Sequence, residues 1–195
     1  MIDKIISESL NGLKDSSQHL ITLFSLVIST KSKNVLELGV RNGDTTMPLL
    51  HALSYTNGKL TSVDISENFN LRNEIKNKNW SYIISDAIDF VKNIENGILY
   101  DLILIDDWHD GDHLYNEIIY LEKHITPSTV ILIHDCMCPN TQPNYHIYND
   151  KSGEFGNGGP FAAIEKLDKS KWEYSTIPVN NGLTILRKLG EIVKF

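Results

Sequence analysis

The chain has 195 residues, of which 41% are hydrophobic and 22% are charged, and its formal net charge is -7. This length and composition are typical of one folded domain, and the negative charge argues against a nucleic-acid partner. The first residues lack the apolar segment of a signal peptide, no run is long enough to span a bilayer, and two cysteines are too few for a disulfide scaffold. We therefore expect a cytoplasmic protein that does not bind membranes.

Helical and strand-like patterns alternate along the chain. Residues 2–30 carry apolar side chains at helical spacing. Runs rich in β-branched and apolar residues predict strands at 34–38, 59–63, 80–84, 100–105 and 129–133. Helical patterns separate these strands, at 45–54, 67–77, 86–93 and 113–124. After an aperiodic stretch, we expect a helix at 159–167 and an antiparallel hairpin built from 172–177 and 183–186.

This alternation predicts an α/β fold, with a parallel sheet and helices on both of its faces. We expect one domain over residues 1–195, with N-terminal helices in 1–32, a Rossmann-like core in 33–188 and an active-site loop in 134–158. The N-terminal helices are expected either to cover the cleft or to form a homodimer contact. Ligands of such folds bind at the carboxyl ends of the strands, which is where the polar clusters described next are found.

The segment ELGVRNG, residues 37–43, follows the first strand. Gly39 permits a sharp turn and the close approach of a ligand, and Gly43 is expected to open a helix at which Thr45 can donate a hydrogen bond. A dinucleotide-binding turn has glycine where this chain has Glu37, because a pyrophosphate must come close there. A carboxylate at that position instead favours a ligand with an ammonium group, such as the methionine part of S-adenosylmethionine (SAM).

Acidic residues also follow the second and third strands. Asp64 can accept hydrogen bonds from the ribose hydroxyls of a nucleoside. Asp86, which Ala87 follows, could accept a hydrogen bond from the amino group of an adenine, or it could cap the helix that comes next. Both roles of Asp86 are consistent with the sequence.

The fourth strand ends in the segment IDDWH, residues 105–109. Trp108 offers a flat face to an adenine ring, and His109 could take a proton from a hydroxyl group. Asp106 could ligate a cation or bind the substrate. We interpret Asp107 and Asp110 as solvated loop residues.

The fifth strand ends in His134 and Asp135. Because the fourth and fifth strands should be neighbours, Asp106 and Asp135 are expected to converge. With a nearby histidine they could hold Mg²⁺ or another divalent cation. A metal-free alternative has His134 as the base and Asp135 as the residue that orients it.

Six segments in this order resemble the motifs of class I SAM-dependent methyltransferases: ELGVRNG, SVDIS, SDAIDF, LILIDDWH, ILIHDC and NGLTILRK. Within that superfamily the chain is similar to small-molecule O-methyltransferases of the catechol type and of the sugar-modifying types. The resemblance implies a seven-stranded, mostly parallel sheet with an antiparallel last strand. It also implies that Asp64 holds the ribose and that the methionine part of SAM is held by Glu37, Gly39, Gly43 and Thr45.

The catechol type has a motif of the form D-x-W-basic after its fourth strand. By this resemblance Asp106 is a metal ligand, Trp108 contacts the adenine, and His109 stands where the base is usually lysine. The metal pair after the fifth strand is Asp-Asn in that type but Asp135-Cys136 here. With the alignment moved by one residue, His134-Asp135 matches the Glu-Asp pair of the sugar-modifying relatives.

The sequence therefore predicts methyl transfer from SAM to a hydroxyl group of a small molecule or sugar. One alternative is a nicotinamide-dependent oxidoreductase, against which Glu37 argues. A second alternative is a non-catalytic nucleoside-binding module on the same fold, against which the clusters around His109 and His134 argue.

Overall fold

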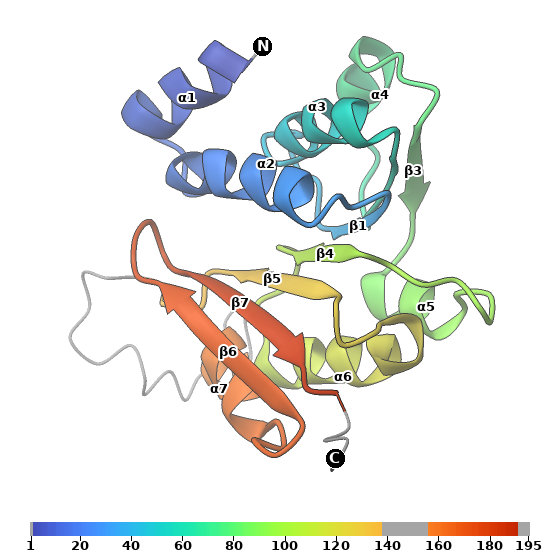
Figure 1. Ribbon diagram of the computed structural model, residues 1–195, viewed down its shortest axis with the longest axis vertical. Coiled ribbons are helices and arrows are strands. Elements are labelled where there is room, and N and C mark those ends of the chain that lie inside the picture. The colour runs from blue at the N-terminus through green and yellow to red at the C-terminus, as the bar shows by residue number, and fades with distance from the viewer. Residues whose placement is uncertain (1, 138–155, 191–195) are drawn as a thin grey trace.

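The computed structural model describes residues 2–137 and 156–190, in which a central sheet lies between two groups of helices (Figure 1). The α-helices are α1 (Ile2–Asn11), α2 (Leu20–Ser29), α3 (Thr46–Thr56), α4 (Phe69–Glu74), α5 (Ala87–Lys92), α6 (Gly111–Leu121) and α7 (Gly159–Lys166). The strands are β1 (Asn34–Leu38), β2 (Lys59–Asp64), β3 (Trp80–Ile84), β4 (Leu102–Ile105), β5 (Val130–His134), β6 (Trp172–Ile177) and β7 (Leu183–Lys188). Short 3-10 helices occupy Ser17–His19, Glu122–His124 and Gly156–Gly158.

The seven strands lie in the order β3-β2-β1-β4-β5-β7-β6. Strands β1 to β5 are parallel to one another, and β7 pairs antiparallel with both β5 and β6. The order reverses between β1 and β4, where consecutive crossovers pass to opposite faces of the sheet. A crevice opens at such a switch point, beyond the carboxyl ends of the strands.

Alternating side chains of each strand enter two separate hydrophobic cores. Leu36 and Leu38 of β1 belong to the core beneath α5, α6 and α7. Val35, which precedes Leu36 and points to the opposite face, belongs to the other core, with α1, α2 and α3. The central strands β1, β4 and β5 are thus buried on both faces, as their nearly continuous apolar runs predict.

The predicted fold class is confirmed, including the number of strands and the antiparallel last strand. Strand β4 begins at Leu102 and not at residue 100. Just before it, the Asp101 carboxylate accepts hydrogen bonds from the backbone amides of Lys33 (2.7 Å) and Asn34 (2.9 Å). Most of the predicted active-site loop, 138–155, lies outside the described residues. Within the described part of the chain, no helix has the length and apolar character needed to cross a membrane.

Candidate active site

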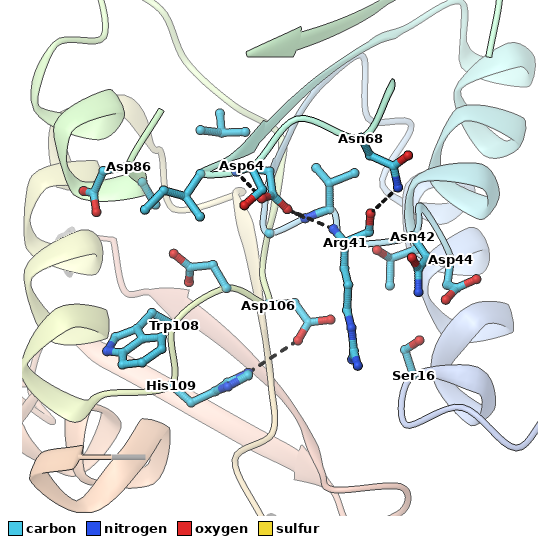
Figure 2. Close-up of a pocket in the computed structure, with 18 of the residues that line it drawn as sticks. Ser16, Arg41, Asn42, Asp44, Asp64, Asn68, Asp86, Asp106, Trp108 and His109 are labelled. Atoms are coloured by element: carbon cyan, nitrogen blue, oxygen red, sulfur yellow. Dashed lines mark hydrogen bonds and ion pairs between the residues drawn. The ribbon is translucent and has the colours of Figure 1, made fainter. Parts of the chain in front are cut away.

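A cavity of about 1090 Å³ lies at the carboxyl ends of the parallel strands (Figure 2). Residues after β1, β2, β3, β4 and β5 all contribute to its wall, as do Asp15 and Ser16 before α2. Pockets for small ligands usually have volumes of about 300–1,000 Å³. The cavity therefore has room for a nucleoside-sized ligand with a second small molecule beside it.

The turn after β1 brings backbone against backbone at Gly39. The φ angle of Gly39 is +86°, and a Cβ atom there would come within 2.0 Å of the carbonyl oxygen of Asp106. The left-handed backbone and this close approach both require glycine. Gly39 therefore sets the spacing between the β1 turn and the end of β4 on the cavity wall.

The position of Glu37 corrects the prediction that its carboxylate meets the cofactor. The side chain is fully buried and does not line the cavity. The strand pleat directs it to the α3 side of the sheet, where its oxygens accept hydrogen bonds from Thr45 (2.7 Å), Thr46 (2.9 Å) and Ser62 (2.5 Å). Burial raises the pKa of Glu37 to about 7, although these hydroxyl donors oppose the shift. Glu37 thus stabilises the turn after β1 through hydrogen bonds on the side of the turn away from the cavity.

Two neighbouring residues also differ from expectation. The Thr45 hydroxyl is directed to Glu37, so only the remaining parts of Thr45 face the cavity. The Gly43 amide donates to the carbonyl oxygen of Val40 (2.8 Å) and is not left open for an anion. Gly43 has a φ angle of +75°, and a Cβ atom there would come within 2.5 Å of the Leu71 side chain. Gly43 is therefore needed for packing behind the turn.

Asp64 lies in the cavity wall at the end of β2, as predicted. Its Oδ2 accepts hydrogen bonds from the backbone amides of Val40 and Arg41, both at 2.9 Å, and its Oδ1 accepts from Ser66 (2.8 Å). A carboxylate offers about four acceptor sites, so these three amides leave about one on Oδ1 for a ligand. Asp64 also joins the β1 turn to the β2 turn.

Asp86 and Trp108 lie on one side of the cavity, and Arg41, with the turn that carries it, lies opposite (Figure 2). Ala87, next to Asp86 in the chain, also lines the cavity. Asp86 is the N-cap of α5, where its side chain accepts a hydrogen bond from Asp89 (3.1 Å). The capping role considered for it is therefore confirmed, and its place in the cavity wall is compatible with a ligand contact as well. The Trp108 indole is 48% exposed, so a large part of its surface is accessible to a ligand.

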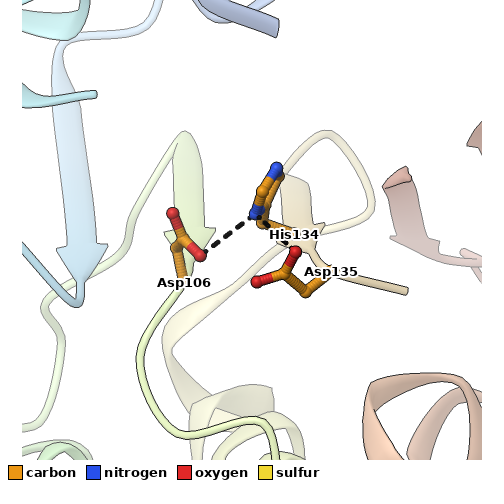
Figure 3. Close-up of side chains that lie close together, drawn as sticks. All are labelled: Asp106, His134 and Asp135. Carbon is orange, nitrogen blue, oxygen red and sulfur yellow. Dashed lines mark ion pairs between the residues drawn. The ribbon is translucent and has the colours of Figure 1, made fainter. Parts of the chain in front are cut away.

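The ends of β4 and β5 bring together two carboxylates and two imidazoles. His134 Nδ1 lies 3.2 Å from Asp106 Oδ1 and 3.3 Å from Asp135 Oδ1 (Figure 3). His109 Nε2 lies 2.9 Å from Asp135 Oδ2 and 3.6 Å from Asp106 Oδ1. Asp106, Asp135 and His109 line the cavity, whereas His134 is 3% exposed and lies behind them. The expected convergence of Asp106 and Asp135 is confirmed.

The charges of this cluster are strongly coupled. Burial opposes the charged form of His109, but hydrogen bonds and charge from Asp106 and Asp135 outweigh it and raise the pKa to about 10. The same two carboxylates raise the pKa of His134 to about 10 against its burial. The pKa of the Asp135 carboxyl is lowered by both imidazoles, despite its burial. The two carboxylates thus favour the protonated form of both imidazoles, and the imidazoles favour the ionised form of both carboxylates.

The predicted solvated positions of Asp107 and Asp110 are wrong. Asp110 is the N-cap of α6, and its Oδ1 accepts from the amides of Asp112 (2.9 Å) and His113 (3.0 Å). Its Oδ2 accepts from the side chain of Asn157 (2.8 Å). Asp107 lies in the cavity wall and faces His113, whose Nε2 is 3.3 Å from Asp107 Oδ2.

Several residues of the cavity wall were not singled out in the sequence. Arg41 extends its side chain into the cavity (Figure 2). Its guanidinium lies 3.3 Å from the Asp15 carboxylate. Asn68 donates to the Arg41 carbonyl oxygen (2.9 Å) and so holds the same turn. Asp15 and Ser16, in the turn between α1 and the 3-10 helix before α2, also line the cavity.

We compared the chain with protein-family models, with solved structures and with curated sequences. A family model described as a methyltransferase domain matches residues 36–136. The chain is similar in structure to an O-methyltransferase from Bacillus cereus in complex with SAH, with 19% identity and a TM-score of 0.71, over 96% of this chain and 88% of that one. No sequence among the curated proteins matches significantly.

Two further solved structures share the fold. The O-methyltransferase TomG from Streptomyces achromogenes, in complex with SAM, is 15% identical with a TM-score of 0.69, over 97% of this chain and 89% of that one. The MycE methyltransferase of the mycinamycin biosynthetic pathway, in complex with Mg and SAH, is 14% identical with a TM-score of 0.67, over 99% of this chain and 55% of that one. The family model spans more than half of the chain, and the cavity lies at the strand ends where its motifs converge. The chain therefore belongs to the methyltransferase domain family and is a class I SAM-dependent methyltransferase.

Proposed function

We propose that this methyltransferase transfers the methyl group of SAM to a hydroxyl oxygen of a small molecule or sugar. One observation carries the proposal: Asp106, His109 and Asp135 line the same cavity as the β1 turn and Asp64. Groups that can bind and deprotonate a hydroxyl thus lie beside the strand ends that bind nucleoside ligands in this fold. Solved structures of the same fold include O-methyltransferases such as TomG.

The cofactor is assigned to the part of the cavity nearer β1, β2 and β3. The adenine would lie between Ala87 and Trp108, with Asp86 accepting a hydrogen bond from its amino group. Asp64 would accept from the ribose through its remaining acceptor site, and the β1 turn at Gly39 would hold the methionine part. Arg41, opposite Trp108, is suited to the carboxylate of that part, because a guanidinium binds carboxylates in a planar fork.

The reaction needs an aligned nucleophile and the removal of one proton. The substrate oxygen forms a bond to the methyl carbon, the bond from that carbon to sulfur breaks, and its electron pair stays on the sulfur. The hydroxyl proton passes to a base in the cavity. His109 is favoured over His134 as this base, because His109 faces the cavity and His134 lies behind it.

The raised pKa of His109 bears directly on this role. An imidazole with a pKa of about 10 already holds its proton at neutral pH and cannot accept another. The carboxylates of Asp106 and Asp135 cause that shift, so a cation bound to them would favour neutral His109. The proposed metal and the proposed base are therefore linked.

The residues present fit a divalent cation. The ligand atoms of Asp106, His134 and Asp135 lie within 4.8 Å of one another. His134 Nδ1 and Asp135 Oδ1 are buried without a hydrogen-bond partner among the described residues, although they lie 3.3 Å apart. One imidazole with two carboxylates suits Mn²⁺, Fe²⁺ or Zn²⁺, and Mg²⁺ if water completes its shell. Such an ion would lower the pKa of the substrate hydroxyl and fix its position.

A methyl-transfer assay tests the proposal. Wild-type protein is incubated with methyl-labelled SAM, a divalent cation and a panel of catechols, other hydroxylated metabolites and sugars. We expect labelled ether products, and a kcat that is at least about 100-fold lower for His109→Gln, with an unchanged Kd for SAM. His51→Gln is the matched control, since His51 lies on α3 outside this cavity. Absence of transfer to every hydroxyl acceptor would overturn O-methylation, and full turnover of His109→Gln would remove His109 as the base.

A further inference from the structure

We propose that Asp107, His113 and Glu117 form a second divalent-cation site, separate from the cluster at Asp106 and Asp135. This site would lie between the loop after β4 and the first turns of α6. It shares no residue with the first cluster, and it does not depend on the proposed function.

The backbone brings these three side chains together from two elements. His113 and Glu117 are four residues apart on α6 and so lie on the same face of the helix. Asp107 reaches them from the loop after β4. His113 Nε2 lies 3.3 Å from Asp107 Oδ2 and 3.5 Å from Glu117 Oε1, and the three ligand atoms all lie within 4.8 Å of one another.

These separations match those of ligands that share one ion. Bonds of about 2.0–2.1 Å from zinc to nitrogen or oxygen place tetrahedral ligand atoms about 3.3 Å apart. The two nitrogen–oxygen distances, 3.3 and 3.5 Å, are close to that value. They are also longer than a well-formed hydrogen bond to a charged group, which is about 2.7–2.9 Å. His113 Nε2 and Asp107 Oδ2 are hydrogen-bonded at 3.3 Å, a separation that one bound ion would also span.

The burial of Glu117 is the independent observation that points to a ligand. Glu117 is fully buried, and neither of its oxygens has a hydrogen-bond partner among the described residues. Asp107 Oδ1 is likewise buried without a hydrogen-bond partner among the described residues. A buried carboxylate is costly unless it is paired and hydrogen-bonded, or coordinates a metal. His113, at 3.5 Å, is the only ion-pair contact recorded for Glu117 in the described part of the chain.

The charges of the set are compatible with a divalent cation. Burial and the charge of Asp107 raise the pKa of Glu117 well above its usual range, so without a cation this carboxyl favours its protonated form. A divalent ion with neutral His113 would bring the net charge to zero and take the place of that proton.

The site has a closed side and an open side. Glu117 is buried behind it, whereas Asp107 and His113 line the main cavity, so a further ligand could enter from there. One imidazole with two carboxylates favours Mn²⁺, Fe²⁺ or Zn²⁺ over Ca²⁺. An ion bound there would link α6 to the loop that carries Trp108 and His109, and so would help to position both residues in the cavity.

The experiment uses the full chain with the first cluster disabled. Asp135→Asn removes a ligand of that cluster only, so the remaining binding reports the second site. The protein is stripped with a chelator and titrated with Mn²⁺, followed by electron paramagnetic resonance, and with Zn²⁺ by equilibrium dialysis. We expect Asp135→Asn to bind one ion per chain, and the addition of Glu117→Gln to weaken that binding by at least roughly 100-fold.

Thermal unfolding separates loss of the site from loss of the fold. Glu117→Gln keeps the volume of the side chain and removes a buried charge, so its Tm without metal should equal or exceed that of its parent. Zn²⁺ should raise the Tm of Asp135→Asn and leave that of the double variant unchanged. His113→Gln removes a second proposed ligand, and we expect the same loss of metal binding.

The proposal is overturned if Asp135→Asn binds no ion, or if the double variant binds as tightly as its parent. Neither readout involves methyl transfer, so the proposed function can fail while this site is confirmed, or the reverse.

Discussion

Replacing Glu37 with glutamine should change how the stability of the protein depends on pH. Burial raises the pKa of Glu37 from 4.5 to about 7, so the folded state binds this proton more tightly than the unfolded state. The stabilisation is complete below the unfolded pKa and is lost as the pH rises through the folded pKa. The shift corresponds to about 3 kcal/mol, at about 1.4 kcal/mol per pH unit. Wild-type protein should therefore lose about that much unfolding free energy from this residue between about pH 4 and about pH 8.

The glutamine variant has no proton to release at this position. Its hydrogen bonds to Thr45, Thr46 and Ser62 change its stability by an offset that is the same at every pH, so the difference between the two proteins isolates the titration of Glu37. Urea unfolding at several pH values measures this difference, with Glu95→Gln as the control because Glu95 is exposed. Parallel pH profiles for wild type and Glu37→Gln would refute the account of Glu37 as a buried support of the turn.

Three further predictions concern the cavity. Gly39→Ala should lower the free energy of unfolding by at least about 1–2 kcal/mol because of the positive φ angle alone. The loss should be larger because the Cβ atom would lie 2.0 Å from the Asp106 carbonyl oxygen. A variant with wild-type stability in urea unfolding and wild-type affinity for SAM would contradict this. Asp64→Asn should weaken SAM binding by roughly 10–100-fold in calorimetry, because the amide loses the charge that holds the Val40 and Arg41 amides and the ribose; an unchanged Kd would show that Asp64 does not act on the ligand. Chelation should lower turnover, and added Mn²⁺ or Mg²⁺ should restore it; a rate indifferent to chelator would rule out a cation at Asp106 and Asp135.

The fold was predictable because its signals are local. Apolar runs such as that of β4, and helical spacing such as that of α6, depend on residues a few positions apart. The order of such runs then predicts a parallel sheet, and the sheet predicts that Asp106 and Asp135 meet. Strand pairing confirms this, with Ile105 of β4 beside Ile133 of β5.

The site was less predictable because the direction of a side chain is not a local property of a motif. Glu37 stands between Leu36 and Leu38, so the pleat alone places it on the opposite face from them, but the continuous apolar run hides which face meets the ligand. Asp110 could have been recognised as an N-cap from its place before α6. The contact of Asp107 with His113 and Glu117 depends on how the loop after β4 packs on α6, and no spacing in the sequence specifies that. Arg41 was likewise missed, because its role depends on which side of the turn faces the cavity.

The central claim is that the cavity at the switch point between β1 and β4 binds SAM. Equilibrium dialysis of purified protein against labelled SAM and, separately, against labelled NAD tests it most directly. We predict one SAM bound per chain, displaced by SAH and indifferent to NAD, and weakened in Asp64→Asn. Retention of NAD with no binding of SAM would contradict the account.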